Sequence, residues 1–281
     1  MTNRLLLCTD MDRTVIPNGR HPEHPQAREF FRELCGSTAV KLVYVTGRHL
    51  QLVEQAIIDY QLPQPDYAIT DVGTKIYCRK QEKWDEISAW QEQIAGDWRG
   101  KSHDQLHQAL SKFPELTLQE PSKQNDLKLS YYLPLAVDQN KILAQIDEQL
   151  TQLGVDVSLI WSIDEPEQVG LLDVLPRNAS KLHSIEFLQQ YLGYELPEVV
   201  FAGDSGNDLP VLASSIRSIL VANAESEIKQ QALQLARQNG YAETLFLAQQ
   251  DNFFLGGNYS AGVLQGVAYF APEIGEKLIS S

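Results

Sequence analysis

Cysteine is scarce in this sequence, and its few copies argue against two classes of small scaffold. The chain has three cysteines in 281 residues, Cys8, Cys35 and Cys78. A disulfide framework or a structural zinc site needs a paired or clustered set, and this set is neither. Cys8 lies within an apolar run, where a thiol behaves as a small hydrophobic side chain. The sparse cysteines therefore favour a reducing cytoplasm as the location of the protein.

Long apolar runs and an excess of basic residues are also missing. No apolar stretch approaches the ~20 residues that a membrane-spanning helix needs. An acidic motif is reached by residue 10, so we expect no signal peptide. The chain has 23 Lys and Arg against 37 Asp and Glu, a formal net charge of −14. This charge disfavours nonspecific binding to nucleic acid or to an anionic membrane, so neither is an expected partner, and an anionic substrate would need local positive charge at its site.

Apolar runs alternate with helical patterns at both ends of the chain. Strands are predicted at 4–9, 41–45, 66–70, 198–202, 217–221 and 244–247, and helices at 25–35, 50–58, 180–192, 208–214, 225–238 and 260–270. This alternation indicates βαβ units around a parallel sheet. The length suggests about two domains. The expected fold is α/β, with a doubly wound, Rossmann-like core and an inserted, smaller α+β cap domain.

The character of the sequence changes near residue 80. Residues 81–112 are polar, carry three tryptophans and are predicted to be helical for much of their length. They are followed by strand patterns at 127–133, 155–161 and 169–175 and by a helical pattern at 138–153. The first of these strands alternates with period two, as a half-exposed antiparallel strand does. We therefore assign residues 1–80 and 171–281 to the core and residues 81–170 to the cap.

Polar motifs directly follow three of the predicted core strands. They span residues 10–14, 46–48 and 203–208, and a fourth polar residue, Lys181, opens the helix predicted at 180–192. The carboxyl ends of parallel strands open onto one crevice, where ligands bind. The motifs therefore predict a single site in which carboxylates, a hydroxyl and cations surround a space the size of a phosphate.

Asp10 and Asp12 are two residues apart just after the first strand, so both can point into the crevice. One carboxylate can attack a phosphoryl group to form an aspartyl-phosphate. The other can protonate the leaving oxygen and then deprotonate water. Two acids this close repel each other and a phosphate, so a divalent cation is expected, and Mg²⁺ suits oxygen ligands. Taken alone, the pair is also compatible with a polar turn.

Thr46, Gly47 and Arg48 offer a hydroxyl and backbone amides that can hold phosphate oxygens. The alternative is a strand-to-helix turn in which Thr46 caps the next helix. Lys181 lies in a first helical turn, where the helix dipole disfavours a cation. A phosphate and a nucleophilic carboxylate facing the lysine would offset that cost. The alternative for Lys181 is a solvated helix residue.

The segment 203–208, Gly-Asp-Ser-Gly-Asn-Asp, is the most specific of the four motifs. Its glycines allow a tight turn, Asp204 and Asp208 can hold a cation, and Asn207 can orient a neighbour. The alternative is an Asp/Gly turn with Asp208 near a helix start. The apolar run before the segment and the helical pattern after it favour the site.

In this order, the four motifs resemble those of the haloacid dehalogenase-like phosphatase superfamily. The segment 199–211 is similar to the branch that carries a large α/β cap (type II) between the second and third motifs. Within that branch the chain resembles the sucrose-phosphate phosphatases and the related mannosylfructose-phosphate phosphatases, and segments 71–77, 128–131 and 258–263 support this. The resemblance implies Mg²⁺-dependent hydrolysis of a sugar phosphate, with sucrose 6-phosphate as the preferred substrate.

The resemblance also implies a role for each motif residue. Asp10 would be the nucleophile and Asp12 the acid/base. The phosphate ligands would be Thr46, Gly47, Arg48, Lys181 and Asn207. The magnesium ligands would be Asp10, Asp12 through its carbonyl, and Asp204, with Asp208 in support. Arg13 departs from the family, which usually has a smaller or neutral residue at this position.

The cap is expected to recognise the sugar, because the core motifs use their polar groups on phosphate and metal. Lys128 is the best candidate for binding hydroxyls, and the alternative is a solvated surface lysine. Trp84, Trp90, Trp98 and Tyr131 could stack on a sugar ring or form the cap core. Two other functions remain open: a phosphatase for mannosylfructose phosphate or another sugar or polyol phosphate, and a catalytically silent partner of the synthase that makes the sugar phosphate. An active enzyme could also associate with that synthase.

Overall fold

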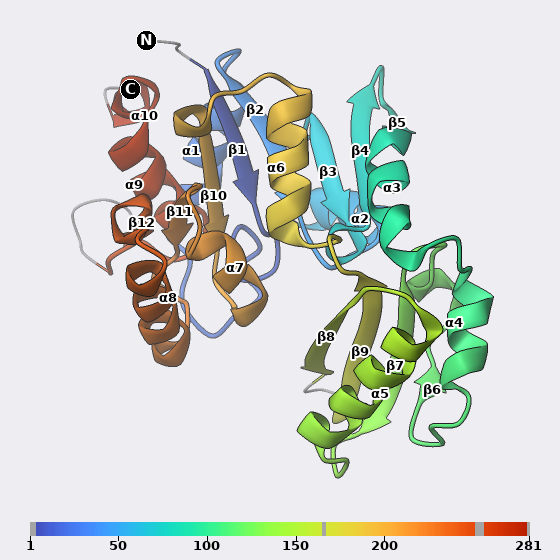
Figure 1. Cartoon of the computed structure of the whole chain (residues 1–281). Helices are drawn as coiled ribbons and strands as arrows, with labels where there is room; N and C mark the ends of the chain where they lie inside the picture. The colour runs from blue at the N-terminus through green and yellow to red at the C-terminus, as the bar shows by residue number, and fades with distance from the viewer. Residues whose placement is uncertain (1–3, 165–166, 251–255, 280–281) are drawn as a thin grey trace.

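In the described part of the computed structural model, the larger of two sheets has eight strands in the order β12-β11-β10-β1-β2-β3-β4-β5 (Figure 1). The structure describes residues 4–164, 167–250 and 256–279. The strands are β1 (Leu5–Thr9), β2 (Val40–Val45), β3 (Tyr67–Thr70), β4 (Lys75–Lys80), β5 (Lys83–Glu86), β10 (Val199–Gly203), β11 (Arg217–Leu220) and β12 (Leu245–Leu247). Strands β12 to β3 pair in parallel, and β4 and β5 form an antiparallel edge. The predicted α/β core is confirmed.

Helices cover both faces of this sheet, because alternate residues of its buried strands point in opposite directions. Leu6 and Cys8 belong to a hydrophobic cluster with one set of helices, and Leu5 and Leu7 belong to a second cluster with another set. The first set is α3 (Ser88–Ala95), α6 (Lys181–Tyr191), α7 (Leu209–Leu212) and α8 (Ser226–Gln238). The second set is α1 (Ala27–Cys35), α2 (Leu50–Asp59), α9 (Ser260–Phe270) and α10 (Pro272–Ile279). This is a doubly wound arrangement.

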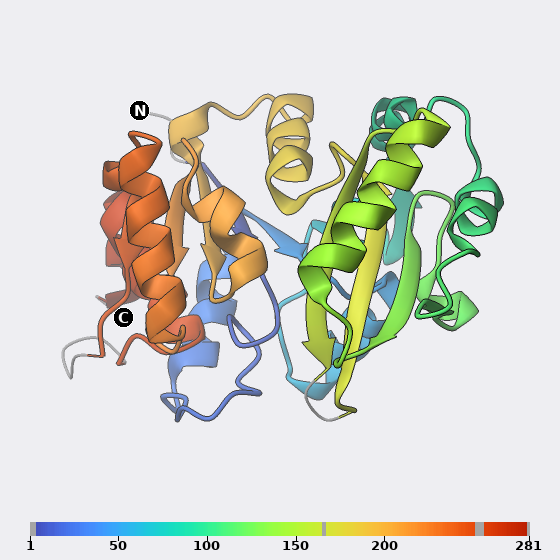
Figure 2. The same cartoon turned by 60° about the horizontal axis from the view of Figure 1, so that its bottom comes forward.

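The smaller sheet is antiparallel, with the strand order β6-β7-β9-β8. Its strands are β6 (Thr117–Leu118), β7 (Leu129–Pro134), β8 (Val157–Asp164) and β9 (Val169–Pro176), and its helices are α4 (His103–Leu110) and α5 (Gln139–Leu153). Helix α5 runs across one face of this sheet (Figure 2). It buries Ile142, Ile146 and Leu150, which recur every fourth residue on one side of the helix.

Strand pairing moves both domain boundaries expected from the sequence. Strand β5 pairs with β4 in the larger sheet, so residues 83–86 do not belong to the smaller sheet. Strand β9 pairs along its whole length with β8 in the smaller sheet, so residues 171–176 do not belong to the core. Both errors have the same cause: sequence pattern reports a strand's burial but does not identify its partner.

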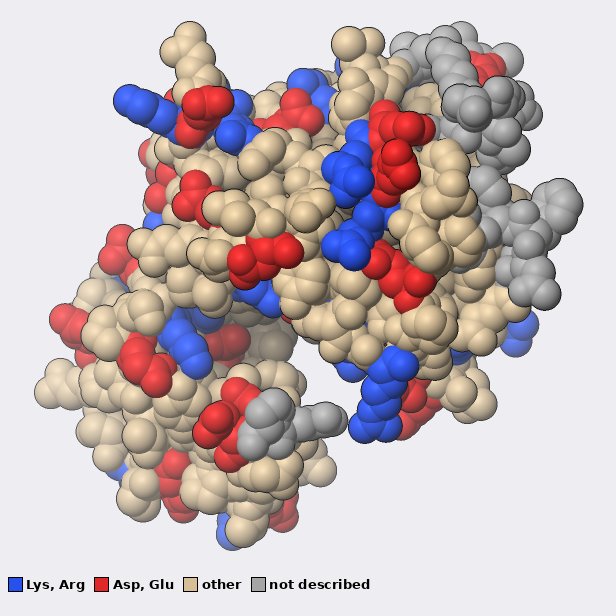
Figure 3. Space-filling model, turned by 180° about the vertical axis from the view of Figure 1, so that it is seen from behind, with Lys and Arg blue, Asp and Glu red and all other residues tan. Residues whose placement is uncertain are grey.

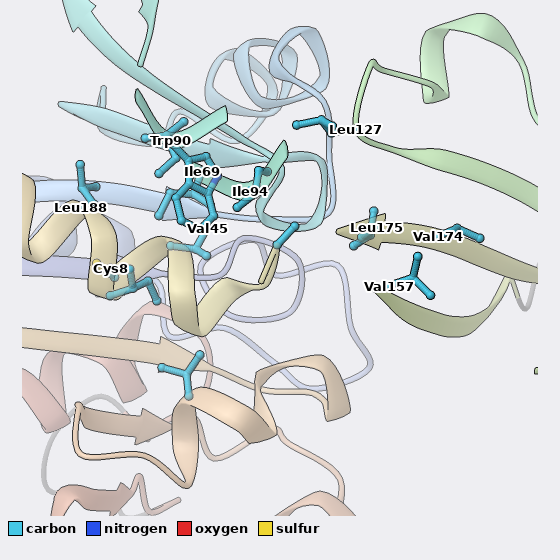
Figure 4. Close-up of a cluster of buried hydrophobic side chains, with 14 of the residues drawn as sticks. Cys8, Val45, Ile69, Trp90, Ile94, Leu127, Val157, Val174, Leu175 and Leu188 are labelled. Atoms are coloured by element: carbon cyan, nitrogen blue, oxygen red, sulfur yellow. The ribbon is translucent and has the colours of Figure 1, made fainter. Parts of the chain in front are cut away.

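Much of the segment 81–112 is helical, as expected, with helical residues at 88–98 and 103–110. The segment includes β5, α3 and α4, and the hairpin of β4 and β5 went unpredicted because these edge strands are polar and partly exposed. Trp90 and Trp98 are fully buried, and Tyr131 is buried too, so these three form core rather than a sugar platform. Trp90 and Ile94 lie near Val45 and Ile69 of the larger sheet (Figure 4).

The surface carries acidic and basic side chains side by side. On the rear face, Lys and Arg lie among Asp and Glu, and a notch separates the two lobes of the molecule (Figure 3). Among the described residues, no helix has both the length and the apolar character needed to cross a membrane.

Candidate active site

A cavity of about 790 Å³ lies where the carboxyl ends of the central strands of the larger sheet meet the smaller sheet. Nine of the ten residues predicted for the site line this cavity, and Asp208 does not. Lys128 comes from the smaller lobe, which contains the smaller sheet, and the other eight come from the larger sheet and the segments that flank it. Other lining residues from the smaller lobe are Gln119, Lys123, Leu159, Ile160, Trp161, Ser162, Leu171 and Asp173. The tertiary structure thus brings the four motifs together at one cavity.

Lys181 connects two of the motifs. Its Nζ lies 3.0 Å from Oδ1 of Asp10, at the end of β1, and 2.7 Å from Oδ1 of Asp208. Lys181 is 4% exposed, so it is not a solvated helix residue. Burial lowers the pKa of the Lys181 ammonium, but Asp10 and Asp208 outweigh that effect and raise it. A cation at the unfavourable end of α6 is therefore stabilised by two carboxylates.

Asp208 holds the loop that follows β10. Its Oδ2 accepts the backbone N–H groups of Asp204 and Ser205, both at 3.0 Å, and its Oδ1 faces Lys181. A Cβ on Gly203 would lie 2.6 Å from Asp208 Oδ2, so only glycine fits there without displacing the carboxylate. Helix α7 begins one residue later than expected, after a turn at 206–208. Asp208 therefore orients Asp204 and Lys181 with both of its oxygens.

Three buried carboxylates converge at this point. One oxygen from each of Asp10, Asp204 and Asp208 lies within 4.8 Å of the others. Burial, with the charge of Asp208, raises the pKa of Asp10 although Lys181 opposes it. Burial, with the charges of Asp208 and Asp10, raises the pKa of Asp204 to about 8 although Arg13 and Lys181 oppose it. A divalent cation would relieve this repulsion, and an all-oxygen donor set fits Mg²⁺ better than Zn²⁺.

The carboxylate of Asp12 is engaged by Arg48. Nε of Arg48 donates to Oδ2 at 2.8 Å and Nη2 donates to Oδ1 at 2.6 Å. Asn18, which the sequence analysis did not single out, donates to Oδ1 at 2.8 Å. Burial raises the pKa of Asp12, but Arg48 and Asn18 outweigh it, and the net shift is downward. Arg48 was expected to bind phosphate, and here its guanidinium lies on the second carboxylate of the first motif instead.

Thr46 lies at the end of β2 and is 1% exposed. Its hydroxyl oxygen accepts the N–H of Arg48 at 3.2 Å, which tightens the turn around Gly47. His49, not Thr46, is the N-cap residue of α2, so the capping alternative is wrong. Asn207 lines the cavity, and its Oδ1 lies 3.4 Å from Nζ of Lys181.

A strained turn lies beside Thr46. Asp71 and Val72 have φ values of 52° and 60°, in the left-handed region that a β-branched residue rarely adopts. Val72 lines the cavity, and its N–H donates to the carbonyl of Thr46 at 3.3 Å. The sequence pattern gave no signal for this conformation, because Val72 is not a residue type that usually has a positive φ.

Lys128 lies between two carboxylates from different lobes. Its Nζ is 3.8 Å from Asp71 of the larger lobe and 3.9 Å from Asp173 on β9. Lys128 is 6% exposed, so the solvated-lysine alternative is wrong. It precedes β7 by one residue rather than lying within the strand. Asp173 was missed, although an acid within the apolar run of β9 was a signal for it.

Trp161 is the tryptophan that lines the cavity. A Cβ on Gly170 of the neighbouring strand would lie 2.7 Å from its indole ring, so the ring packs directly over the glycine. The other three tryptophans were expected either to stack on a sugar or to form the cap core, and Trp161 was missed. The absence of a side chain on Gly170 leaves room for this large ring.

The chain is similar to known proteins along most of its length. The family model of sucrose-6F-phosphate phosphohydrolase matches residues 3–271. A putative HAD-like hydrolase of Nitrosococcus oceani is 45% identical over 97% of this chain and 73% of its own length. The mannosylfructose-phosphate phosphatase of Agrobacterium fabrum is 28% identical over 94% of this chain and 96% of its own length.

A solved structure is similar along almost the whole chain. The sucrose-phosphatase of Synechocystis, in complex with sucrose and phosphate, superposes with a TM-score of 0.74 and 28% identity. The match covers 95% of this chain and 98% of that one. Both lobes thus have a counterpart in a solved phosphatase. The chain belongs to the sucrose-6F-phosphate phosphohydrolase family, within the haloacid dehalogenase-like phosphoric monoester hydrolases.

Proposed function

We propose that this enzyme is a Mg²⁺-dependent phosphatase that hydrolyses sucrose 6-phosphate to sucrose and phosphate. Membership of the family supports the hydrolysis of a sugar phosphate. The observation that carries the proposal is the buried Asp10, with Lys181 at 3.0 Å, at the base of a cavity of about 790 Å³. A cavity of this size exceeds what phosphate alone would fill, so it has room for a sugar.

The proposed reaction has two steps. In the first, a carboxylate oxygen of Asp10 attacks phosphorus, the bond from phosphorus to the sugar oxygen breaks, and Asp12 gives that oxygen a proton. In the second, water attacks the aspartyl-phosphate, Asp12 takes a proton from the water, and phosphate and the Asp10 carboxylate are released. Lys181 would stabilise negative charge on the transferring group.

Asp12 must be protonated before the first step, and Arg48 favours its ionised form. We infer that a bound phosphate dianion attracts the Arg48 guanidinium away from Asp12. A bidentate guanidinium suits either a carboxylate or a phosphate. This exchange would make Asp12 a better proton donor only when substrate is present, and it agrees with the expected role of Arg48 as a phosphate ligand.

Magnesium would be held by Asp10, the carbonyl of Asp12 and Asp204, with Asp208 and Asn207 in support. When bound, it would neutralise charge on the phosphoryl group. The crowding of three carboxylates supports this assignment, because their repulsion is costly without a cation.

The smaller lobe is proposed as the cap that selects the sugar. Both carboxylates near Lys128 Nζ lie beyond hydrogen-bond distance, so its N–H groups can donate to sugar hydroxyls. Asp173 can accept from a hydroxyl, and Trp161 offers an aromatic face. Buried polar groups that bind sugar hydroxyls discriminate strongly against a substrate that lacks those hydroxyls, because the buried groups are then left unpaired.

Phosphate release from a panel of sugar phosphates tests the proposal. The highest kcat/KM is expected for sucrose 6-phosphate, followed by mannosylfructose phosphate, with fructose 6-phosphate far lower. Preference for mannosylfructose phosphate would change the substrate but leave the reaction in place. No release from any of the panel, in the presence of Mg²⁺, would instead favour the silent partner of a synthase.

Location in a reducing cytoplasm and association with the synthase that supplies the substrate belong to the same proposal. Co-sedimentation of the purified chain with such a synthase would test the association. Separate migration of the two proteins at micromolar concentrations would contradict it.

A further inference from the structure

The side chain of Asn223 connects the segment that follows β1 to the loop that contains Tyr259. Asn223, which follows β11, is 7% exposed. Its Nδ2 donates to the carbonyl of Arg13 at 2.6 Å, and its Oδ1 accepts the N–H of Tyr259 at 2.8 Å. Both ends of one amide side chain are therefore used on backbone groups that lie 210 and 36 residues away in the sequence.

Both residues that Asn223 holds have unusual backbone conformations. Arg13 has a φ of 58°, and Tyr259 has a φ of 52° with a ψ of −133°. Such conformations are unfavourable for a residue other than glycine, and they persist only where the surroundings impose them. Tyr259 is fully buried, and its hydroxyl donates to the carbonyl of His21 at 3.1 Å. Tyr259 thus contacts, through its hydroxyl, the segment that contains Arg13.

A chain of hydrogen bonds continues from Arg13 to Asp12. The N–H of Arg13 donates to Oδ1 of Asn18 at 2.9 Å, and Nδ2 of Asn18 donates to the Asp12 carboxylate at 2.8 Å. The conformation of Arg13 therefore fixes the position of Asn18, and Asn18 contacts the group that would move the proton. From the sequence, Arg13 was expected only to depart from the family pattern.

We propose that Asn223, with Tyr259, is a positioning residue for proton donation by Asp12. Asn223 touches no reacting atom, since it acts through the backbone of Arg13 and the side chain of Asn18. This inference rests on the proposed acid/base role of Asp12 and extends it to a loop more than 200 residues away in the sequence. It predicts a defect confined to the step in which the leaving oxygen needs a proton.

Two aryl phosphates distinguish that defect from general damage. Nitrophenolate leaves as a stable anion and needs little protonation, whereas the more basic phenolate depends on an acid. The rates of product release in the first turnover are measured for 4-nitrophenyl phosphate and phenyl phosphate in saturating Mg²⁺. Their ratio does not depend on the fraction of folded enzyme, because both esters report on the same active molecules.

The main variant is Asn223→Asp, which keeps an acceptor for Tyr259 but places an oxygen against the carbonyl of Arg13. The phenyl phosphate rate should fall by about tenfold or more, since general acid catalysis supplies about 10²–10⁴-fold. The nitrophenyl phosphate rate should fall much less. Asn18→Ala, at an exposed position, should shift the ratio in the same direction.

Asn239→Asp is the matched control, because Asn239 also donates to a backbone carbonyl, that of Ala213 at 2.9 Å, away from the cavity. It should leave the ratio unchanged. Asp12→Asn supplies the reference and should shift the ratio most. An unchanged ratio in both Asn223→Asp and Asn18→Ala, with a shifted ratio in Asp12→Asn, would overturn this inference alone. An unchanged ratio in Asp12→Asn would overturn the acid role of Asp12, and the inference with it.

Discussion

Arg48 holds both carboxylate oxygens of Asp12, with Nε 2.8 Å from Oδ2 and Nη2 2.6 Å from Oδ1. The two residues are 36 positions apart and come from the first and second motifs. A fork of this kind keeps a carboxylate ionised, which suits a base but not an acid. The phosphate of a substrate would therefore compete with Asp12 for the guanidinium of Arg48.

Arg48→Lys tests that competition. Lysine keeps the charge but cannot form the bidentate contact. Because hydrogen bonds to charged groups contribute about 1.5–3 kcal/mol, kcat/KM should fall by about tenfold or more. The inhibition constant of inorganic phosphate should rise in parallel. An unchanged phosphate inhibition constant would show that Arg48 only orients Asp12.

Asp10→Asn should abolish turnover, because an amide does not attack phosphorus. Loss of a nucleophile costs at least about 10³-fold in kcat. The metal-free variant should unfold at the same temperature as the wild type or higher, since one of three repelling carboxylates is neutralised. Asp59→Asn, at an exposed position at the end of α2, is the control and should change neither quantity. Substantial phosphate release by Asp10→Asn would refute the nucleophile assignment.

Mg²⁺ should raise the thermal midpoint of the protein even in the absence of substrate. A ligand at 100 times its Kd stabilises the folded state by about 2.7 kcal/mol. Asp204→Asn should remove most of this stabilisation, because it removes a proposed ligand. Differential scanning fluorimetry with and without chelator measures both. Full activity in excess chelator would remove the metal from the mechanism.

Gly203→Ala should destabilise the protein and impair the site together. The added Cβ would lie 2.6 Å from Asp208 Oδ2, so the carboxylate that holds Lys181 must move. Overpacking of this kind costs about 1–3 kcal/mol. Gly96→Ala is the control, because a Cβ there would meet nothing within 4 Å. Urea unfolding and phosphate release are the measurements, and a wild-type result for Gly203→Ala would show that Asp208 need not keep its position.

Lys128→Ala should narrow substrate discrimination. The ratio of kcat/KM for sucrose 6-phosphate over fructose 6-phosphate should fall by about tenfold or more, since an unpaired buried polar group is a strong discriminator. Cleavage of 4-nitrophenyl phosphate should change less. Lys112→Ala, an exposed substitution in the same lobe, controls for general effects. An unchanged ratio would show that Lys128 does not contact the second ring.

The sequence by itself determined the doubly wound core and the grouping of its motifs. The apolar runs that come before Asp10, Thr46 and Asp204 could be recognised as strands, because a strand buried on both faces has a continuous apolar pattern. The order of the motifs then identified the family, and the match over residues 3–271 agrees. Local pattern was sufficient here because each motif follows its own strand directly.

Only the tertiary structure decided which side chains meet across these motifs. The pairing of Arg48 with Asp12, the position of Lys128 between Asp71 and Asp173, and the clamp of Asn223 on Arg13 join residues far apart in the chain. Nothing in the local sequence encodes such contacts, because they depend on how strands order themselves in a sheet and how two lobes approach. The left-handed conformations of Arg13, Val72 and Tyr259 were hidden for the same reason: their surroundings impose them against the preference of each residue.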